Sequence, residues 1–416
     1  MSRGAAKVLA RAKLLLSLIH DMAARVYLDY NATTPVEPAV LEAMLPYFSG
    51  EFGNAASVHS PGQRAGAAVE TAREQVAAFI GARPQEIVFT SGGTESDNHA
   101  LFGMCDPTNY SAQNIISTVV EHEAVLHTCQ SLEARGVTVA YLSVDRDARV
   151  SPEHLRELLK TLLDTTLVSV MHANNETGTV QPLEELASIA AEADVYFHTD
   201  AVQSAGKLPI NVNTLQVDLL SISAHKIYGP KGVGALYVRA GTPLRQFLFG
   251  GRHQRGIRPG TENVAGIVGL GQAAELAGKA LAQDAVRIGA LRDDFERGLL
   301  QRVPQSRVNG ATATRTPNTT NMLFPGVDGE ALLIALDLKG IACSTGAACS
   351  SGAVEPSHVL TAMGLSVEEA RSSLRFSLGR HTTREEIDFA LLTIPKTVEQ
   401  LREISPNYGK GLAQTT

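Results

Sequence analysis

The chain has 416 residues, of which 44% are hydrophobic and 19% are charged, and its formal net charge is -7. A chain of this length and composition can form two lobes around a sizeable core, and its acidic balance argues against a nucleic-acid-binding protein. No segment approaches the roughly 18 consecutive apolar residues that a membrane-spanning helix needs.

Residues 1–24 differ in character from the sequence that follows. Four basic residues precede the first acidic residue, and a short apolar run extends from Leu14 to Ile19. A transit peptide or a weak signal segment has such features, although the pattern of a cleavage site is missing. Met22 stands just before the regular pattern described below, so residues 1–21 are better explained as an upstream extension or a misassigned start. We therefore expect residues 1–24 to be an N-terminal extension that is disordered or not native.

From residue 25 onward, helical and strand-like patterns alternate without a low-complexity linker. Apolar residues recur on one helical face from Gly62 to Ile80, and Gly81 provides a C-cap. This alternation predicts an α/β fold with a mostly parallel, doubly wound sheet. The strand-like runs are 114–120, 137–142 and 167–172, and helical stretches lie at 153–163 and 183–193.

A glycine turn, Ser91-Gly92-Gly93-Thr94, joins a strand-like run to a helical pattern. The strand-like run begins at Glu86, and the helix is expected to begin at or just after Thr94. Backbone N–H groups at a helix start form a cradle for phosphate, and glycines let the chain approach the ligand closely. Most glycine turns bind nothing, so this signal is weak by itself.

Two later strand-like runs end in residues with reactive or charged side chains. The run 195–199 ends on Asp200, with Gln203 three residues on, and the run 217–222 leads into Ser223-Ala224-His225-Lys226. In open α/β sheets, ligands bind beyond the carboxyl ends of the strands, so both ends should face one crevice. An amine for a Schiff base and a carboxylate for a pyridinium nitrogen are what a pyridoxal phosphate site needs. A lysine after a strand is also a common surface residue, so this interpretation depends on the convergence of all three strand ends.

The C-terminal third has a different pattern. A long helical stretch from about 265 to 303 leads into a mixed region with strand-like runs at 321–324 and 373–377, and we place a smaller α/β domain there. A run of small residues, 343–353, contains Cys349 and has too few large apolar groups to pack firmly.

The four cysteines are Cys105, Cys129, Cys343 and Cys349. They form no CxxC pair, which argues against a zinc site, and we expect no metal. Few cysteines and no secretory pattern lead us to expect a reducing cytoplasm.

The motifs together resemble those of the NifS/IscS-type cysteine desulfurases, class V aminotransferases with the pyridoxal phosphate fold type I. The resemblance extends from about Val26 to about Pro406, in order and at family spacing. It implies a large cofactor-binding domain of residues 36–264, and a small domain of residues 25–35 and 265–416 that carries the cysteine loop. Besides Cys349 in its loop, the motifs are Tyr27-Leu28-Asp29-Tyr30-Asn31-Ala32-Thr33-Thr34-Pro35, Thr94-Glu95-Ser96-Asp97, Glu121-His122, Asn174-Asn175-Glu176-Thr177-Gly178, His198-Thr199-Asp200-Ala201-Val202-Gln203, Ser223-Ala224-His225-Lys226, Arg258-Pro259-Gly260-Thr261-Glu262-Asn263 and Arg375-Phe376-Ser377-Leu378-Gly379-Arg380.

The resemblance implies pyridoxal 5′-phosphate as the cofactor. Lys226 would hold it as a Schiff base and move protons, and Asp200 would keep the pyridine nitrogen protonated. Gln203 would hydrogen-bond the phenolic oxygen, and His122 would stack on the ring and act as an acid or base. The remaining cofactor-binding residues would be Gly93, Thr94, Asn175, Ser223, His225 and Thr261. In the family, the loop of Thr261 reaches the phosphate of the neighbouring subunit, which implies a homodimer.

The substrate would be L-cysteine, whose carboxylate Arg375 would clamp in bidentate geometry, with Asn175 at the same end. Cys349 would take the sulfur from the bound cysteine as a persulfide, leaving L-alanine, and would then pass the sulfur to an acceptor. Cys343 departs from the family pattern, and we interpret it as a small buried residue; a second persulfide acceptor or a disulfide partner is the alternative.

Several motifs look closer to the nitrogenase-associated NifS branch, which favours delivery of sulfur to an iron–sulfur scaffold protein for nitrogenase clusters. General iron–sulfur assembly, thiamine synthesis and tRNA thiolation stay open as destinations. The alternatives to a desulfurase are a selenocysteine lyase, an aminotransferase of the same fold that needs no loop thiol, and a non-catalytic sulfur carrier or scaffold.

Overall fold

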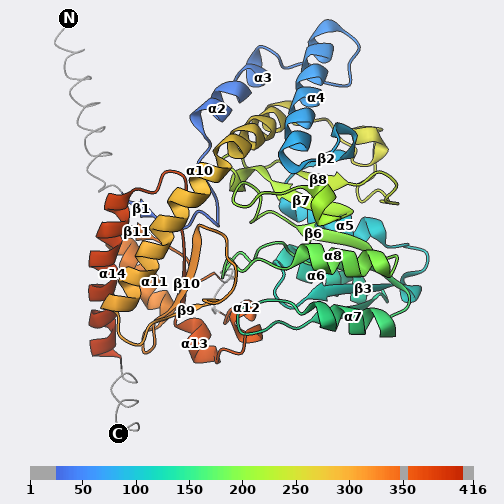
Figure 1. Ribbon diagram of the computed structural model, residues 1–416. Helices are drawn as coiled ribbons and strands as arrows, with labels where there is room; N and C mark the ends of the chain where they lie inside the picture. The colour runs from blue at the N-terminus through green and yellow to red at the C-terminus, as the bar shows by residue number, and fades with distance from the viewer. Residues whose placement is uncertain (1–24, 347–354, 406–416) are drawn as a thin grey trace, which may run out of the picture.

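The structure is a computed structural model that describes residues 25–346 and 355–405 (Figure 1). The expected N-terminal extension, residues 1–24, and the expected nucleophile Cys349 lie outside these described residues. None of the described helices is long and apolar enough to cross a membrane.

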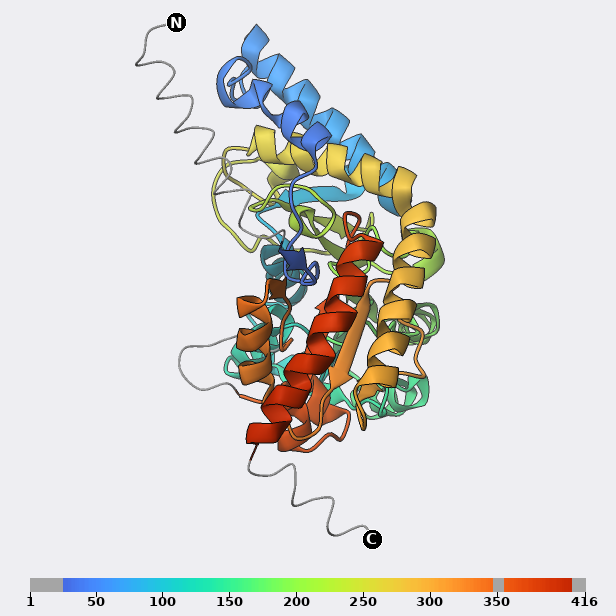
Figure 2. The same cartoon turned by 90° about the vertical axis from the view of Figure 1, so that its left-hand side faces the viewer.

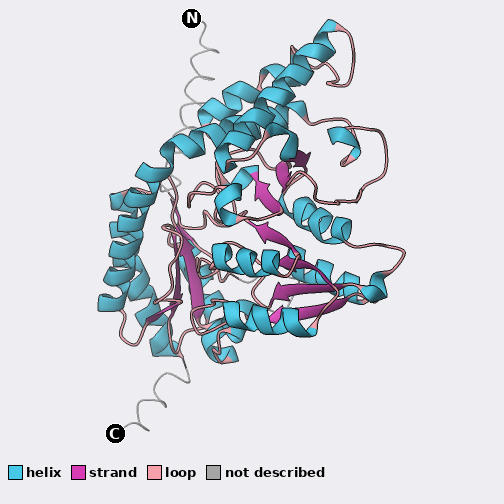
Figure 3. Cartoon of the chain, turned by 45° about the vertical axis from the view of Figure 1, so that its right-hand side comes forward, coloured by secondary structure: helices cyan, strands magenta, loops and turns pink. Residues whose placement is uncertain are grey.

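A seven-stranded sheet lies at the centre of the larger part of the molecule (Figure 3). Its strand order is β2-β8-β7-β6-β5-β3-β4, and only β8 runs antiparallel to its neighbours. The strands are β2 (Ile87–Thr90), β3 (Asn114–Thr118), β4 (Thr138–Leu142), β5 (Thr165–Ser169), β6 (Tyr196–Asp200), β7 (Leu219–Ser223) and β8 (Gly234–Val238). The prediction of a mostly parallel sheet is therefore confirmed.

Helices cover both faces of this sheet. Successive side chains of a strand point to opposite faces, and accordingly Ile116 packs into one apolar core while Ile115 packs into another. Leu220 and Leu219 divide between the same two cores, which is the doubly wound architecture that the sequence predicts. The helices are α4 (Ser60–Ile80), α5 (Gly93–Met104), α6 (Glu123–Glu133), α7 (Pro152–Thr161), α8 (Leu183–Glu192) and α9 (Val212–Leu215).

The smaller part has its own apolar core and a three-stranded antiparallel sheet, in which β10 lies between β9 and β12. Phe376 lies at its centre, with its ring centroid 5.3 Å from that of Phe295 and 6.4 Å from that of Phe324. A two-stranded parallel sheet of β1 and β11 ties the start of the described chain to this part. The elements are β1 (Val26–Tyr27), β9 (Arg307–Asn309), β10 (Thr319–Leu323), α11 (Gly329–Leu338), β11 (Ile341–Ala342), α12 (His358–Ala362), α13 (Val367–Arg371), β12 (Ser373–Ser377) and α14 (Arg384–Ile404).

The long helix α10 (Val264–Arg302) connects the two parts. It packs against α4 near one end and against α14 near the other, and Figure 2 shows it running along the side of the molecule. Two short helices, α2 (Pro38–Met44) and α3 (Pro46–Ser49), lie beside the start of α10 and project from the body with α4 (Figure 1). The domain boundaries given above stay a prediction.

Most predicted elements lie within a few residues of the observed ones. The strand at 373–377 is observed with the predicted bounds, and Gly81 caps α4 in the left-handed conformation, with φ at 71°. The helix expected at or after Thr94 begins one residue earlier, at Gly93, and the strand expected over 167–172 ends three residues earlier, at Ser169.

Candidate active site

A cavity of about 200 Å³ lies at the carboxyl ends of five strands of the central sheet. The chain leaves each of these strands through a short turn that carries polar side chains into the cavity. The cavity is lined by Gly93, Thr94, Asp97, His122, Met171, Asn175, Asp200, Val202, Gln203, Ser223, His225 and Lys226. It therefore brings together every predicted cofactor-binding residue except Thr261.

Lys226 follows β7 by three residues and is held by the N-terminal segment. Its Nζ donates hydrogen bonds to the carbonyl oxygens of Asn31 (2.5 Å) and Ala32 (2.9 Å). Burial, reinforced by the charge of Arg375, lowers the pKa of Lys226 to about 8. The share of this amine that is neutral near physiological pH is therefore much greater than for an ordinary lysine, and the neutral form is the one that attacks a carbonyl carbon.

Asp200 is the last residue of β6 and is 6% exposed. Its Oδ1 accepts a hydrogen bond from the backbone N–H of Val202 at 2.8 Å, and burial raises the pKa of the carboxyl. The nearby charge of Lys226 acts in the opposite direction, although no ion pair joins the two side chains within the described residues. A buried carboxylate of this kind is matched by a cationic ring nitrogen.

The glycine turn takes the form that a phosphate cradle requires. Gly92 has φ 156° and ψ -177°, a conformation that is essentially restricted to glycine. A Cβ on Gly93 would lie 2.7 Å from Cγ2 of Val202, so a larger residue at the start of α5 would force the neighbouring chain to shift. The first N–H groups of a helix have no partner within it, and here they lie beside Ser223, at the rim of the cavity.

His122 is the N-cap of α6, and its Nδ1 accepts a hydrogen bond from the backbone N–H of Ala124 at 3.1 Å. This bond fixes the ring and leaves Nε2 for another partner. The preceding residue, Glu121, is fully buried, and burial raises the pKa of its carboxyl to about 8. One oxygen of Glu121 accepts bonds from Met171 and Thr118, so Glu121 ties the start of α6 to the end of β5.

Arg375 lies on β12 in the smaller part and is 5% exposed. Its Nη2 donates to Asp29 at 2.7 Å and its Nη1 donates to the carbonyl oxygen of Asn175 at 3.0 Å. Its Nε, although buried, has no hydrogen-bond partner in the described chain. Each Nη group also carries a second N–H that these two bonds do not use, so the guanidinium has donors left for an amino-acid carboxylate.

Cys343 lies next to Ser344, which pairs with Arg375. Burial raises the pKa of the Cys343 thiol to about 12, and the residue packs against the apolar core of the smaller part. This agrees with the expected packing role, because a thiol with so high a pKa is a poor nucleophile.

Both ends of the segment that contains Cys349 meet the buried side chain of Glu176. Its Oε2 accepts a 2.6 Å hydrogen bond from Ser357, and a Cβ on Gly346 would lie 2.8 Å from the same oxygen. Glu176 follows Asn175 directly, so the described ends of the cysteine segment are anchored beside the cavity.

Thr261 is exposed and does not line the cavity of its own chain. The adjoining motif is ordered by Arg258, which forms a two-pronged ion pair with Glu95 of α5 at 2.8 and 3.1 Å. The loop of Thr261 is therefore tied to the phosphate-cradle helix while its threonine faces outward.

Some residues of the site were not predicted from the sequence. Asn31, Asp29 and Lys207 all contact predicted site residues through side chains or backbone. Asn31 and Asp29 stand in a motif that was recognised, but their partners lie far along the chain. The spacing of Lys207, four residues after Gln203, is the one local signal that could have indicated it.

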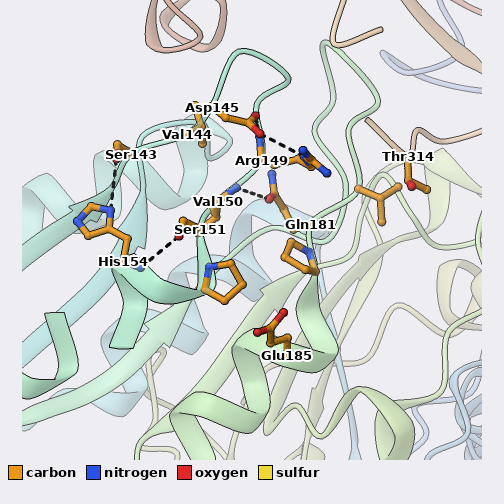
Figure 4. A pocket seen from close by; sticks show the side chains of 13 residues that line it. Ser143, Val144, Asp145, Arg149, Val150, Ser151, His154, Gln181, Glu185 and Thr314 are labelled. Carbon is orange, nitrogen blue, oxygen red and sulfur yellow. Dashed lines mark hydrogen bonds and ion pairs between the residues drawn. The ribbon is translucent and has the colours of Figure 1, made fainter. Parts of the chain in front are cut away.

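A larger hollow, of about 960 Å³, lies elsewhere on the molecule (Figure 4). Several of its polar side chains pair with one another or with the backbone: Asp145 bonds Arg149, Ser143 bonds His154, and Gln181 bonds the N–H of Val150. It has no lysine, so it cannot supply the chemistry that is concentrated at Lys226.

The residues of the cavity fit pyridoxal phosphate on their own chemistry. A partly neutral amine, a buried carboxylate without a cationic partner and an open helix start stand around one cavity. These match the aldehyde, the ring nitrogen and the phosphate of the cofactor respectively.

Comparisons with known proteins agree with this chemistry. The family model described as "Aminotransferase class-V" matches residues 26–389. A cysteine desulfurase IscS from Dictyoglomus turgidum is 49% identical over 385 residues, covering 92% of this chain and 97% of the relative. A solved NifS-like protein is 39% identical with a TM-score of 0.85, covering 91% of this chain and 100% of that chain. A structure described as SspA in complex with cysteine is 37% identical with a TM-score of 0.76, covering 86% and 99%.

Proposed function

Because the chain belongs to the class V aminotransferase family and is a pyridoxal-phosphate-dependent cysteine desulfurase, we propose that its reaction takes place in the cavity of Lys226 and uses Cys349 as the sulfur acceptor. The observation that carries this proposal is the convergence of Lys226, Asp200 and the start of α5 on one cavity, with Arg375 beside it. Bound pyridoxal phosphate supplies an electron sink that weakens bonds near the α-carbon of an amino acid.

The residues of the chain have separate tasks. Lys226 would hold the cofactor through its amine and would move protons at the substrate carbon atoms. Asp200 would keep the ring nitrogen protonated, and Gln203 would donate to the phenolic oxygen. His122 would stack on the ring and act as an acid or base. Gly93, Thr94, Ser223 and His225 would hold the phosphate, together with Thr261 of the partner subunit.

The substrate L-cysteine is held by its carboxylate at Arg375 and Asn175. The thiolate of Cys349 attacks the sulfur atom, the carbon–sulfur bond breaks, and the substrate carbon receives a proton. The products are L-alanine and a persulfide on Cys349, and atoms and electrons balance because the sulfur gains a bond to sulfur as it loses its bond to carbon. No external oxidant or reductant is needed.

The sulfur acceptor in this proposal is an iron–sulfur scaffold protein, and the preferred context is the assembly of nitrogenase clusters. The naming of one relative as IscS and of one solved neighbour as NifS-like supports the iron–sulfur destination. The reduced Cys349 thiol requires a reducing compartment, and we place the enzyme in the cytoplasm. Cluster formation on an added scaffold protein, followed by absorbance with L-cysteine as the sulfur source, tests the destination.

The enzyme acts as a homodimer in this proposal. Large apolar side chains are exposed from α2 to the start of α4, with Phe48 64%, Phe52 77% and Val58 89% exposed. Exposed apolar patches of this kind are typical of interfaces. A second copy that covered this face would bring a second subunit next to the site, as the assignment of Thr261 to the partner's phosphate requires.

Alanine formation tests the reaction class. Purified protein with pyridoxal phosphate and L-cysteine is expected to form alanine without any 2-keto acid, and the Lys226→Ala variant is expected to form none. An aminotransferase would need the keto acid, and a selenocysteine lyase would strongly prefer selenocysteine over cysteine. Either result would refute the proposal.

A further inference from the structure

Lys207 is a second amine beside the active site, close to Lys226. It lies in the turns after β6, four residues after Gln203, and lines a small cavity of about 30 Å³ that Lys226 also borders. Its Nζ donates to Oε1 of Gln203 at 2.7 Å and to Oδ1 of Asn31 at 3.1 Å. Within the described chain, both partners of this amine are neutral amides.

The backbone partners of both amides show which end of each is nitrogen and which is oxygen. Nε2 of Gln203 donates to the backbone carbonyl of Asn31 at 3.0 Å, and Nδ2 of Asn31 donates to the backbone carbonyl of Asn175 at 3.1 Å. A carbonyl oxygen only accepts, so each amide nitrogen must face its carbonyl and each amide oxygen must face the amine. Two buried oxygens therefore converge on one donor.

The electrostatic setting suits an uncharged donor. Burial lowers the pKa of Lys207 well below its usual value, and the charges of Lys226 and Arg375 lower it further. Although the residue keeps some accessible surface, a neutral amine still donates two hydrogen bonds without adding positive charge next to Lys226. An arginine, which stays charged, could not do this.

Asn31 and Gln203 contact the groups that would react or bind the cofactor. The carbonyl oxygen of Asn31 accepts from Nζ of Lys226 and from Nε2 of Gln203. Gln203 also lines the cofactor cavity, and one hydrogen of its NH₂ group is not used by Asn31. If the amide of Gln203 rotated by half a turn, an oxygen would replace that N–H and repel an anionic acceptor.

We propose that Lys207 is a positioning residue that holds the oxygen of the Gln203 amide while the carbonyl oxygen of Asn31 holds its nitrogen, so that the remaining N–H of Gln203 faces the phenolic oxygen of the cofactor. This inference rests on the proposed role of Gln203. It assigns Lys207 to the preparation of the site before substrate binds.

A double-mutant cycle tests the proposal through cofactor binding rather than turnover. Apo-forms of the wild type, Lys207→Met, Gln203→Met and the double variant are titrated with pyridoxal phosphate, and the absorption maximum of the bound cofactor is recorded. Each single variant is expected to bind the cofactor about five- to tenfold more weakly, the effect of one buried hydrogen bond, and to shift the absorption maximum. The double variant is expected to match Gln203→Met within about twofold, because Lys207 acts through that amide.

Two further variants complete the test. Lys207→Gln keeps a neutral N–H donor and is expected to restore most of the wild-type absorption, whereas Lys279→Met, which removes an exposed lysine of α10 paired with Glu275, is expected to change nothing. Thermal unfolding of each apo-form separates loss of the fold from loss of the cofactor.

The outcomes separate the inference from the proposed function. Three results would overturn the role of Lys207 and leave that of Gln203 intact. The first is weaker cofactor binding in Gln203→Met but not in Lys207→Met. The second is additive losses of affinity in the double variant, and the third is a Lys207→Gln variant that binds the cofactor no better than Lys207→Met. If Gln203→Met itself has no effect, the proposed role of Gln203 falls, and the inference falls with it.

Discussion

Lys226 and Asp200 show how the site prepares its charges at the scale of single residues. Burial acts in opposite directions on the two groups, lowering the pKa of the amine to about 8 and raising the pKa of the carboxyl. A cofactor with an aldehyde and a cationic ring nitrogen would react with the neutral amine of Lys226 and would pair with the carboxylate of Asp200. The hydrogen bonds of Lys226 and Asp200 and their mutual attraction offset part of the cost of burying them, and such a ligand would offset more of it.

The pKa of Lys226 gives a testable pH dependence. The neutral amine is the attacking form, so the rate of cofactor attachment to the apo-enzyme should rise with pH and level off above about pH 8. An unperturbed lysine would continue to rise to about pH 10.4. The charge of Arg375 lowers this pKa, so Arg375→Leu should shift the midpoint of the rate–pH curve to higher pH. Stopped-flow absorbance measures the attachment rate of the wild type and of the variant.

Arg371→Leu provides the matched control for that measurement, since Arg371 is exposed at the end of α13, near Arg375 in sequence. The rate–pH curve of Arg371→Leu should have the same midpoint as that of the wild type. A wild-type rate that keeps rising beyond pH 10 would show that Lys226 is an ordinary surface amine.

The two cysteines of the 343–353 run can be told apart by substitution. Burial and the charge of Asp29 hold the pKa of Cys343 at about 12, so its thiol carries almost no thiolate at neutral pH. Cys343→Ser should keep sulfur release from L-cysteine within a few-fold of the wild type, and Cys349→Ser should abolish it. Sulfide release in the presence of a reductant measures both, and the reverse result would exchange the two assignments.

At the scale of elements, the strand ends explain how much the sequence could predict. Asp200, Lys226 and the Gly92-Gly93 turn each follow an apolar strand, and parallel strands bring their carboxyl ends to one edge, so local pattern and topology sufficed. The contacts of Asn31 with Asn175, Thr319 and Lys226 join segments more than 140 residues apart. No periodicity encodes such contacts, and for that reason Asn31, Asp29 and Lys207 were not predicted.

Boundaries were predicted less well than the elements themselves. The apolar run that suggested a strand to residue 172 continues past the end of β5, because Val170 and Met171 are buried in the turn that leads to the cavity. Val170 and His172 also donate backbone hydrogen bonds to His198 and Asp200 of β6, so pairing with β6 continues beyond the assigned end of the strand. The short strands β1 and β11 depend on pairing between distant segments and were missed as a sheet.

The start of α5 offers a test at this scale. In Gly93→Ala, the new methyl group would lie 2.7 Å from Cγ2 of Val202, so the cradle must shift and cofactor affinity should fall on the order of tenfold. Removing that methyl in the Gly93→Ala, Val202→Ala double variant should recover most of the affinity. Equilibrium titration with pyridoxal phosphate measures the affinity of each variant. Gly278→Ala in α10 is the control, because its added methyl makes only ordinary contacts. Unchanged affinity in Gly93→Ala would rule out a tight phosphate cradle there.

At the scale of the whole molecule, the segment from Asp29 to Thr34 links the two parts. Its residues pair with Ser377 of the smaller part and with His225 and Lys226 of the larger one. Arg375, the proposed substrate clamp, and Lys226, the proposed cofactor amine, are thus held by one stretch of chain, which keeps Arg375 in register with Lys226.

The exposed apolar face of α2 and α3 yields a prediction on assembly. Replacing Leu45 and Phe48 by glutamate should place charges in the interface and convert a dimer to a monomer, with weaker cofactor retention because Thr261 of the partner is lost. Analytical ultracentrifugation measures the mass. Leu163→Glu, at an 84% exposed leucine beyond α7, should leave the dimer intact, and a wild-type protein that is an active monomer would contradict the shared site.

The most direct test follows the sulfur atom itself. The holoenzyme is mixed with L-cysteine without reductant, quenched after a single turnover, and digested; mass spectrometry then locates added sulfur while alanine is quantified. We predict one added sulfur atom on the peptide that contains Cys349 for each alanine formed, and neither product in Lys226→Ala. Alanine without sulfur on Cys349, or an unmodified Cys349 after exposure to substrate, would contradict the central claim.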